Sequence, residues 1–486
     1  MRYAHEVGKV RAAEQALMAR LPEGTLMQRA ATGLAAVCAG LLPTLYGSYV
    51  VLLIGSGDNG GDALYAGARL ARRGVRVEAI LAGSKVHESG LAALRTAGGR
   101  VTTEETAIDA AELVIDGLTG IGGQGALREP YAHLAARAAD SEAIVVACDV
   151  PSGVDASTGE VAGAAIWADV TVTFGTHKPG LLIDPGATHC GVVELIDIGL
   201  GADLPDPDVV SAQLGDINPP RATPESDKYR RGVVGVLAGS ERYPGAAVLS
   251  TGGAVHGGAG MVRFVSVQSV VNLVRQRWPE AVTTVIEAGD AEAALDVGRV
   301  QAWVAGPGLG TGEDAEALIA AVLGTDLPVL IDADGLTVLA GSQACRRDLL
   351  RRSAPTVLTP HAGELARLLV AERKDIEARR LEHARRAAVE LSAIVLLKGS
   401  TTLIAEEDRP VRVNPTGTPR LATAGTGDVL SGLIGALLAG GLAALDAATA
   451  GAYLHGLAAR LASEEGAPIS AYDVITALPE AFHAVR

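Results

Sequence analysis

Residues 49–62, YVVLLIGSGDNGGD, decide the fold of the first half of the chain. An apolar run leads into glycines with G-x-G-x-x-G spacing, and the segment that follows, ALYAGARLARRG, has apolar residues at helical intervals. A strand, a tight glycine-rich turn and a helix in this order are typical of a dinucleotide-binding unit. The turn nevertheless contains Asp58 and Asp62, and two carboxylates repel a pyrophosphate unless a cation lies between them.

The residues of this turn alone leave three interpretations open. It is an ordinary turn whose aspartates cap the helix, a plain NAD-binding loop with Glu78 near the ribose, or the loop of a different ligand site. Two more strand ends favour a site, because Asp116 closes the run LVID and Asp149 closes VVACD, each before a glycine-containing turn. The carboxyl ends of parallel strands meet at one edge of a sheet, so these groups converge on one crevice.

The whole chain alternates strand-like and helix-like runs, which predicts parallel sheets covered by helices on both faces. A segment rich in Pro, Asp and Gly begins near residue 201 and marks a domain boundary. We predict a first domain over residues 1–210, a linker over 211–224 and a second domain over 225–486. Strands are expected at 49–55, 75–83, 113–118, 143–150, 170–175 and 192–199, and then at 232–239, 261–267, 302–308, 328–335, 356–364 and 393–406.

Composition excludes several classes of protein. The chain has 486 residues, 48% hydrophobic and 20% charged, as expected of a globular protein of two or three domains. Its net charge of −15 argues against nucleic acid or a membrane surface as a partner. The four cysteines have no paired spacing, so no disulfide framework or zinc site is indicated, and a cytoplasmic location is expected. The apolar segment 430–445 is expected to be a core helix, and arginine pairs such as Arg379-Arg380 are expected on solvated helix faces.

Four motifs of the first half occur in the order of a known family: DNGGD, VIDGLTGIGGQGA, CDVPSGVDASTGEV and ADVTVTFGTHKPGLLIDPGA. Together they resemble the NAD(P)H-hydrate epimerase domain and cover nearly all of residues 1–210. The resemblance implies a Rossmann-like three-layer α/β/α domain whose substrates are the hydrates of NADH and NADPH, called NADHX and NADPHX below. Asp58 replaces the family's usual Asn, and Ala63 its usual Gly, which bears on substrate affinity and rate.

The resemblance also accounts for the acidic turn, because in that family a potassium ion lies among these loops. The residues that match its ligands are Asn59, Asp116 and Ser152. Epimerisation inverts a hemiaminal carbon, so a group near the hydroxyl must donate and accept a proton, and we expect Asp149 to do so. The residues that match substrate contacts are Asp58, Asn59, Gly60, Gly61, Asp62, Gly120, Ile121, Gly122, Gly123, Gln124, Gly125, Ala126 and Asp149.

In the second half, residues 424–432, AGTGDVLSG, join a glycine-rich turn directly to a long apolar helix. Such a turn forms an anion hole of backbone N–H groups at the positive end of a helix. Asp428, at the start of that helix, has two interpretations. It is a helix cap, or it is a base that takes a proton from a hydroxyl while the anion hole holds a transferring phosphoryl group.

Further motifs accompany that segment: GVVGVLAGSERYPGAAVLS, GPGLG, IDADGL, LTPHAGE and LLKGSTT. Together they resemble the ADP-dependent NAD(P)H-hydrate dehydratase domain, with a ribokinase-like α/β fold, over residues 225–486. The resemblance implies loss of water from the S hydrate, driven by cleavage of the co-substrate ADP to AMP and phosphate, with Mg²⁺ on the nucleotide phosphates. The residues that match substrate contacts are Ala246, Gly308, His361 and Asp428, and those that match nucleotide contacts are Lys398, Gly399, Ser400, Thr401, Thr402 and Gly427.

The two resemblances predict one repair enzyme acting on small molecules, and we expect it to be a homo-oligomer. The first domain would interconvert the R and S hydrates, and the second would restore the S form with Asp428 as the base. Two alternatives stay open: a ribokinase-like small-molecule kinase, and a binding protein with an inactive epimerase domain. Asp332 and Asp334, at another strand end, either approach magnesium or cap a turn. The residues alone do not establish whether NADHX or NADPHX is the preferred substrate. They also do not establish whether the nucleotide is ADP or ATP.

Overall fold

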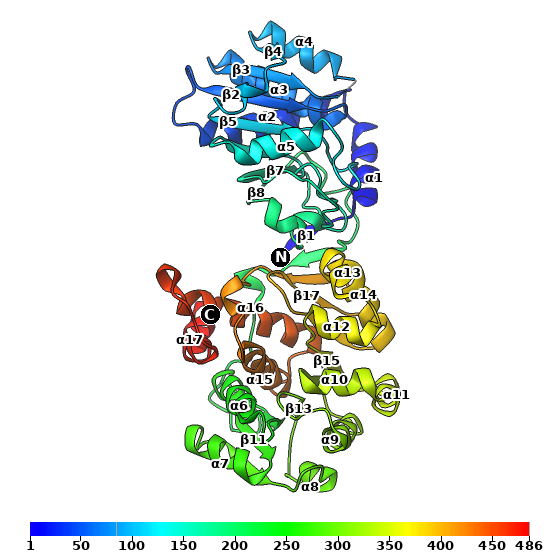
Figure 1. The fold of residues 1–486 in the computed structure, drawn as a ribbon, viewed down its shortest axis with the longest axis vertical. Helices are drawn as coiled ribbons and strands as arrows, with labels where there is room; N and C mark the ends of the chain where they lie inside the picture. Colours follow the sequence, from blue (N-terminus) through cyan, green and yellow to red (C-terminus); the bar gives the residue numbers. More distant parts are fainter. Residues whose placement is uncertain (84, 486) are drawn as a thin grey trace. The chain divides into compact units, whose positions relative to one another are not determined.

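The computed structural model describes residues 1–83 and 85–485, so Ser84 and Arg486, which the predicted domains include, lie outside the described residues. The chain divides into two compact units, Arg2–Val209 and the part from Val210 onward together with Met1. Each unit is described by itself below (Figure 1). The segment predicted as a linker, 211–224, belongs to the second unit.

The first unit contains a parallel sheet with the strand order β4-β3-β2-β5-β6-β7-β8. This is the order of a dinucleotide-binding sheet, extended by one strand at the β7 end. The order reverses between β2 and β5, and ligands of open α/β sheets bind beyond the carboxyl ends of strands at such a reversal. The strands are β2 (Tyr49–Ile54), β3 (Arg76–Leu81), β4 (Arg100–Thr102), β5 (Leu113–Gly117), β6 (Ile144–Cys148), β7 (Val170–Phe174) and β8 (Val192–Ile196), preceded by the short β1 (Arg2–Ala4).

Helices cover both faces of this sheet because its strands are apolar on both sides. Val50, Leu52 and Ile54 of β2 pack with residues of α2, α3 and α4. Val51 and Leu53, which alternate with them, pack with residues of α5 on the other face. The predicted three-layer α/β/α arrangement is therefore confirmed. The helices are α1 (Val7–Met18), α2 (Thr25–Leu41), α3 (Asp58–Arg72), α4 (Glu88–Thr96) and α5 (Tyr131–Asp140).

The second unit has a longer, mixed sheet, in which the strands from β9 onward have the order β9-β18-β17-β16-β15-β14-β13-β10-β11-β12. The pairs from β12 to β16 are parallel, whereas β16, β17 and β18 are antiparallel. The single strand predicted over 393–406 is therefore a hairpin, and β12 and β18 were not predicted. The strands are β9 (Val209–Ser211), β10 (Val233–Leu237), β11 (Met261–Ser266), β12 (Val282–Val285), β13 (Ala302–Ala305), β14 (Val329–Ile331), β15 (Thr356–Leu358), β16 (Ile394–Leu397), β17 (Thr402–Ala405) and β18 (Val411–Asn414).

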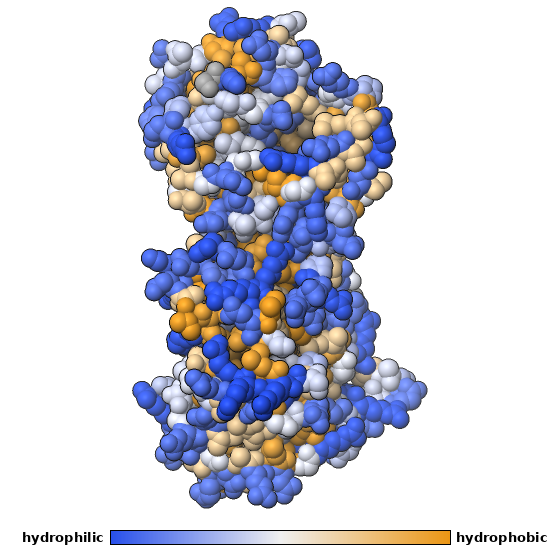
Figure 2. All heavy atoms as spheres, turned by 90° about the vertical axis from the view of Figure 1, so that its right-hand side faces the viewer, coloured by the Kyte–Doolittle hydropathy of each residue, from blue (hydrophilic) through white to orange (hydrophobic). Residues whose placement is uncertain are grey.

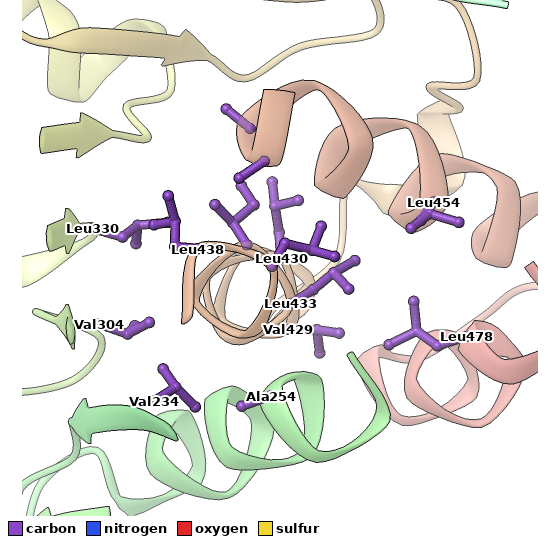
Figure 3. Packing of buried hydrophobic residues seen from close by; sticks show 14 of the residues in the cluster. Val234, Ala254, Val304, Leu330, Val429, Leu430, Leu433, Leu438, Leu454 and Leu478 are labelled. Atoms are coloured by element: carbon purple, nitrogen blue, oxygen red, sulfur yellow. The ribbon is translucent and has the colours of Figure 1, made fainter. Parts of the chain in front are cut away.

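One helix, α15, fills the centre of the second unit. Figure 3 shows it end-on, between strand residues such as Val304 and Leu330 and helix residues such as Leu454 and Leu478. The predicted core helix over 430–445 is confirmed in its first part but ends at Ala439, before α16 begins. The helices are α6 (Pro244–His256), α7 (Gln268–Arg277), α8 (Ala291–Leu295), α9 (Glu313–Leu323), α10 (Asp334–Gly341), α11 (Gln343–Arg351), α12 (Ala362–Leu369), α13 (Arg373–Ala378), α14 (Arg380–Leu391), α15 (Thr426–Ala439), α16 (Ala444–Ala462) and α17 (Ala471–Ala484).

The mostly hydrophilic face in Figure 2 and the free cysteines agree with the expectations drawn from composition. On the face shown in Figure 2, hydrophilic residues predominate and apolar residues are interspersed among them. Within the part of the chain that the structure describes, no helix combines the length and apolar character needed to cross a membrane. All four cysteines are buried and free.

Candidate active sites

The first candidate site lies where the order of the first sheet reverses. The turn after β2 touches the loop after β5, because a Cβ built at Gly55 would lie only 1.8 Å from Leu118 O. A Cβ at Gly120 would lie 3.1 Å from Asn59 Oδ1. Glycine at position 55 is thus required by the close approach of two backbones, and the crevice expected from the sequence is present.

Asn59, Asp116 and Ser152, the predicted potassium ligands, form one polar cluster in this crevice. Asn59 Nδ2 donates to Thr119 O at 2.7 Å and to Cys148 O at 2.6 Å. The Asp116 carboxylate accepts hydrogen bonds from Ser152 N at 2.8 Å and Ser152 Oγ at 2.7 Å. Ser152 Oγ also accepts from Thr119 N at 2.9 Å. The structure therefore brings together carboxylate, hydroxyl and carbonyl oxygens from three loops.

Asp116 is fully buried, and no basic side chain of the described residues pairs with it. Burial raises its pKa to about 6, although hydrogen bonds from Ser152 and Leu118 oppose that rise. A buried carboxylate without a cationic partner, set among neutral oxygens, fits a hard monovalent cation. Across residues 1–83 and 85–485, no group of three His, Cys, Asp or Glu side chains is arranged to hold a metal ion, so a cation here would depend on amide, hydroxyl and carbonyl oxygens in addition to the Asp116 carboxylate.

Asp149, the predicted acid–base residue, follows β6 with a left-handed backbone at φ 67°. Three donors converge on its Oδ1: Lys178 Nζ at 2.5 Å, Thr173 Oγ1 at 3.0 Å and Phe174 N at 3.2 Å. Lys178 is almost completely buried and also donates to Thr173 Oγ1 and Phe174 O, both at 3.0 Å. Because all three bonds go to Oδ1, the other carboxylate oxygen of Asp149 keeps its lone pairs for a ligand.

Three further carboxyl groups surround this ion pair. Asp62, the fifth residue of α3, is buried, and its Oδ1 has no hydrogen-bond partner among the described residues. Burial, and then the charges of Asp149, Asp58 and Glu14, raise the pKa of Asp62 well above its ordinary value. Burial also raises the pKa of Glu14, which lies in α1. A buried carboxyl in this setting is a hydrogen-bond donor when protonated.

Sequence reasoning missed Lys178 and Glu14. Lys178 lies in the motif ADVTVTFGTHKPGLLIDPGA, which was used to identify the domain, but no role followed from its position. Glu14 precedes every motif and carried no signal. The loop Gly120–Ala126 is exposed or half-buried beside this cluster. The other predicted contacts lie in α3, where Asp58 is its first residue and Gly60 and Gly61 are buried.

The second candidate site begins at the N-terminus of α15. The residue before the helix is Gly425, at φ 87°, so no side chain caps the first turn. The first N–H groups of the helix are therefore available to an anion, as a phosphate site requires. Gly427 adds no side chain there, and a Cβ at that position would lie 3.5 Å from Lys398 Nζ and 3.8 Å from Asp332 Oδ2.

Lys398 and Asp332 form an ion pair beneath this helix end. Lys398 Nζ lies 2.8 Å from Asp332 Oδ1 and 3.7 Å from Glu364 Oε2. Ser431 Oγ donates to Asp332 Oδ2 at 2.7 Å. Burial lowers the pKa of Lys398, but Asp332 and Glu364 outweigh burial and raise it, so the ammonium group stays charged. Asp332, whose role was left open between approach to magnesium and capping of a turn, thus fixes the position of Lys398.

Asp428 lies in the first turn of α15 without an ion-pair partner among the described residues. Burial is the main cause that raises its pKa to about 7, with the charge of Asp332 adding to it and that of Lys398 opposing it. A carboxylate whose pKa lies near neutrality is matched to proton transfer at neutral pH. Its partial burial and its raised pKa favour the prediction of a base over that of a simple helix cap.

The other predicted contacts of the second unit lie at helix and strand ends. His361 Nδ1 accepts from Gly363 N at 3.0 Å and from Glu364 N at 3.2 Å, so the ring caps α12, and its Nε2 lies 3.5 Å from Glu364 Oε1. Burial lowers the pKa of His361, so the ring is neutral at pH 7. Gly308 and Ala246 are neighbours, because a Cβ at Gly308, where φ is 66°, would lie 2.8 Å from Ala246 Cβ.

The predicted nucleotide loop, Lys398–Thr402, joins the two strands of the β16–β17 hairpin and is held by an arginine. Arg380 Nη2 lies within hydrogen-bond distance of Leu397 O, Lys398 O and Thr401 O, at 3.3, 3.1 and 3.2 Å. The expectation that this arginine lies on a solvated helix face is wrong, since only 6% of Arg380 is exposed. The guanidinium supplies hydrogen-bond donors to carbonyl groups of the loop that would otherwise be unpaired.

Comparisons with known proteins agree with both halves. Residues 234–480 match the family model described as NAD(P)H-hydrate dehydratase, and residues 23–180 match the model described as YjeF-related protein N-terminus. The chain is 47% identical over 475 residues to the bifunctional NAD(P)H-hydrate repair enzyme Nnr of Mycobacterium leprae, which covers 96% of each protein.

Two solved structures resemble part of the chain. The ADP/ATP-dependent NAD(P)H-hydrate dehydratase of Bacillus subtilis, co-crystallised with ATP and Mg²⁺, has a TM-score of 0.54 and 31% identity over 57% of this chain and 99% of its own. A ribokinase-like superfamily protein of Enterococcus faecalis has a TM-score of 0.50 and 23% identity over 57% of this chain and 96% of its own, which shows the fold alone. The ribokinase-like α/β fold predicted for the second domain is confirmed.

Proposed function

The chain belongs to the family of bifunctional NAD(P)H-hydrate repair enzymes, and from the geometry of its two sites we propose how each half works. The enzyme interconverts the R and S hydrates of NADH and NADPH, and it dehydrates the S hydrate with cleavage of ADP to AMP and phosphate. The kinase alternative is not favoured, because the match to the repair enzyme extends through both halves. We assign epimerisation to residues 1–210 and dehydration to residues 225–486.

We propose that Asp149 and Lys178 carry out epimerisation. The observation that supports this is the arrangement at Asp149, where three donors occupy Oδ1 and no donor from the described residues occupies Oδ2. Lone-pair donation from the ring nitrogen weakens the carbon–oxygen bond, a proton carried by Oδ2 passes to the departing hydroxyl, which leaves as water, and Asp149 is left ionised beside Lys178. Oδ2 then takes a proton from the water that adds to the other face. Lys178 keeps Asp149 oriented and balances its charge.

We propose that Asn59, Asp116 and Ser152 hold a potassium ion, which would supply positive charge beside the acidic turn. The buried Asp116 carboxylate and the surrounding oxygens support this assignment. Exchange of K⁺ for choline in the epimerisation assay tests it. Substrate contacts of Asp58 through Asp62 and of Gly120 through Ala126 stay predictions, and their position on the rim of the same crevice supports them.

For dehydration we propose that Asp428 takes the proton of the substrate hydroxyl while the first N–H groups of α15 hold the phosphoryl group transferred from ADP. Loss of that proton makes the oxygen a nucleophile toward phosphorus. The phosphorylated oxygen then leaves as phosphate, a far better leaving group than hydroxide, and loss of a proton from the neighbouring ring carbon restores the ring double bond. Ala246, Gly308 and His361 would contact the hydrate. Lys398 would neutralise phosphate charge within the loop Lys398–Thr402 and beside Gly427.

Mg²⁺ and ATP accompanied the Bacillus subtilis dehydratase in its crystals. Here we propose that Mg²⁺ is bound with the nucleotide phosphates, where it would offset their charge. A cytoplasmic location also stays a proposal, supported by four free cysteines. The predicted homo-oligomer is tested by light scattering of the purified chain.

The decisive assay follows recovery of NADH absorbance from a mixture of R and S NADHX, in potassium buffer, with ADP, with ATP and without nucleotide. Complete recovery with ADP supports both half-reactions. Recovery that stops when the S form is spent, after correction for spontaneous epimerisation, would contradict the proposed role of the first site. No recovery with either nucleotide would contradict the whole assignment.

A further inference from the structure

Helix α1 places side chains along the first site at positions i, i+4 and i+7, although it contains none of the motifs. Val7 and Ile121, which belongs to the glycine-rich loop, pack against the same buried hydrophobic cluster. The end of Arg11 touches the same loop, since a Cβ built at Gly122 would lie 2.6 Å from Arg11 Nη2. Glu14 lies close enough to Lys178 and Asp149 for both charges to act on it. Residues with this spacing share one helix face, so α1 forms a wall of the crevice.

The loop that Arg11 touches has the character of an anion site. Of the backbone N–H groups from Ile121 to Ala126, only that of Gly123 is bonded to another described residue, to Gly120 O at 2.9 Å. The loop contains no charged side chain. The Arg11 guanidinium itself makes no hydrogen bond or ion pair with other described residues. Free backbone N–H groups beside an unpaired guanidinium suit an oxyanion with several acceptor oxygens.

The turn after β2 has the opposite character. It carries Asp58 and the buried Asp62, with Asp149 and Glu14 nearby, so a doubly charged diphosphate placed there would face several carboxyl groups. We propose that Arg11 and the loop Gly120–Ala126 bind the diphosphate of the hydrated dinucleotide, so that the phosphates lie against the loop after β5 and not in the turn after β2. This rests on the proposed epimerase function of the site.

The positions along α1 agree with the order of groups in the substrate. Glu14 is three residues beyond Arg11, which is about 4.5 Å along a helix at about 1.5 Å per residue, and it lies toward Asp149 and Lys178. In the dinucleotide, one ribose separates the diphosphate from the nicotinamide ring. A diphosphate at Arg11 therefore allows the hydrated ring to reach Asp149. The 2′-phosphate of NADPHX is on the far ribose and would lie away from α1.

The test is epimerisation by the full chain from pure R hydrate without nucleotide, with R and S forms separated by chromatography. In the Arg11→Ala variant we expect KM to rise about tenfold, as for loss of one charge-assisted hydrogen bond, for NADHX and NADPHX alike, with kcat nearly unchanged. Arg11→Lys should recover part of this loss. Inorganic diphosphate should inhibit the wild type competitively and the Arg11→Ala variant more weakly.

Two controls separate this effect from damage to the fold. Arg95→Ala removes the same charge from an exposed arginine of α4 and should leave KM unchanged. Dehydration of pure S hydrate with ADP, measured on the same Arg11→Ala sample, should match the wild type. A KM within twofold of wild type, or a loss equal to that of Arg95→Ala, would overturn the proposal. A rise for NADPHX alone would overturn it in favour of the 2′-phosphate. A wild-type chain that does not epimerise would instead refute the proposed function of the site.

Discussion

Each unit has a lysine paired with a buried aspartate at its site, but the two pairs are connected differently. In the first site Lys178 is bonded directly to Asp149, the proposed acid–base residue. In the second site Lys398 is bonded to Asp332, while Asp428 has no ion-pair partner in the described part of the chain and its pKa rises to about 7. The difference follows the proposed chemistry. Epimerisation returns a proton to the same carboxylate that gave it, whereas dehydration needs a base near a phosphoryl anion.

The largest expected effect comes from removing the unpaired carboxylate. Asp428→Asn should lower the rate of dehydration of S hydrate by about 10²- to 10⁴-fold, the range for loss of a general base. Epimerisation of R hydrate by the same sample should be unchanged, which serves as the control. Asp149→Asn should give the reverse pattern. If either variant lowered both reactions equally, the two sites would not act as the independent centres compared above.

Replacing the lysine of each site should lower the free energy of unfolding by different amounts. Lys178→Met leaves Asp149 buried without its partner, and loss of one member of a buried pair costs about 3–5 kcal/mol. Lys398→Met should cost less, because Lys398 is 22% exposed and Asp332 keeps its bond from Ser431. Urea unfolding followed by tryptophan fluorescence and circular dichroism measures both. Equal losses would contradict the view that only the first site depends on a closed, buried pair.

The pH dependence of dehydration should report the pKa of Asp428. Only the ionised carboxylate accepts a proton, so kcat/KM should fall about tenfold per pH unit below pH 7 and level off above it. Asp332→Asn removes a negative charge that raises this pKa, so the fall of kcat/KM on the acidic side of the pH profile should move to lower pH. If the acidic side of the pH profile did not move in Asp332→Asn, the titration that controls dehydration would belong to another group. Epimerisation in the same buffers is the control.

The comparison also shows what a sequence can and cannot predict. The parallel strands and their glycine-rich ends follow from local patterns, so the fold, the crevice and residues such as Asp116, Asp149 and Asp428 were predicted from sequence. Lys178, Glu14 and Arg380 were not, because their roles depend on partners far away along the chain. Arg380, for example, has the sequence of a surface arginine and becomes buried only when the β16–β17 hairpin brings its carbonyl groups together. Long-range pairing of this kind leaves no periodic signal.

The smallest expected effect concerns the potassium ion that we propose for the first site. At a K⁺ concentration tenfold above its Kd, binding to the folded state should stabilise the first unit by about 1.4 kcal/mol. Asp116→Asn should remove this response while Asp332→Asn, in the second unit, should keep it. Urea unfolding in KCl and in choline chloride at equal ionic strength measures the difference. A K⁺ response that survives in Asp116→Asn would place the ion elsewhere, and the acidic turn after β2 would then need another source of positive charge.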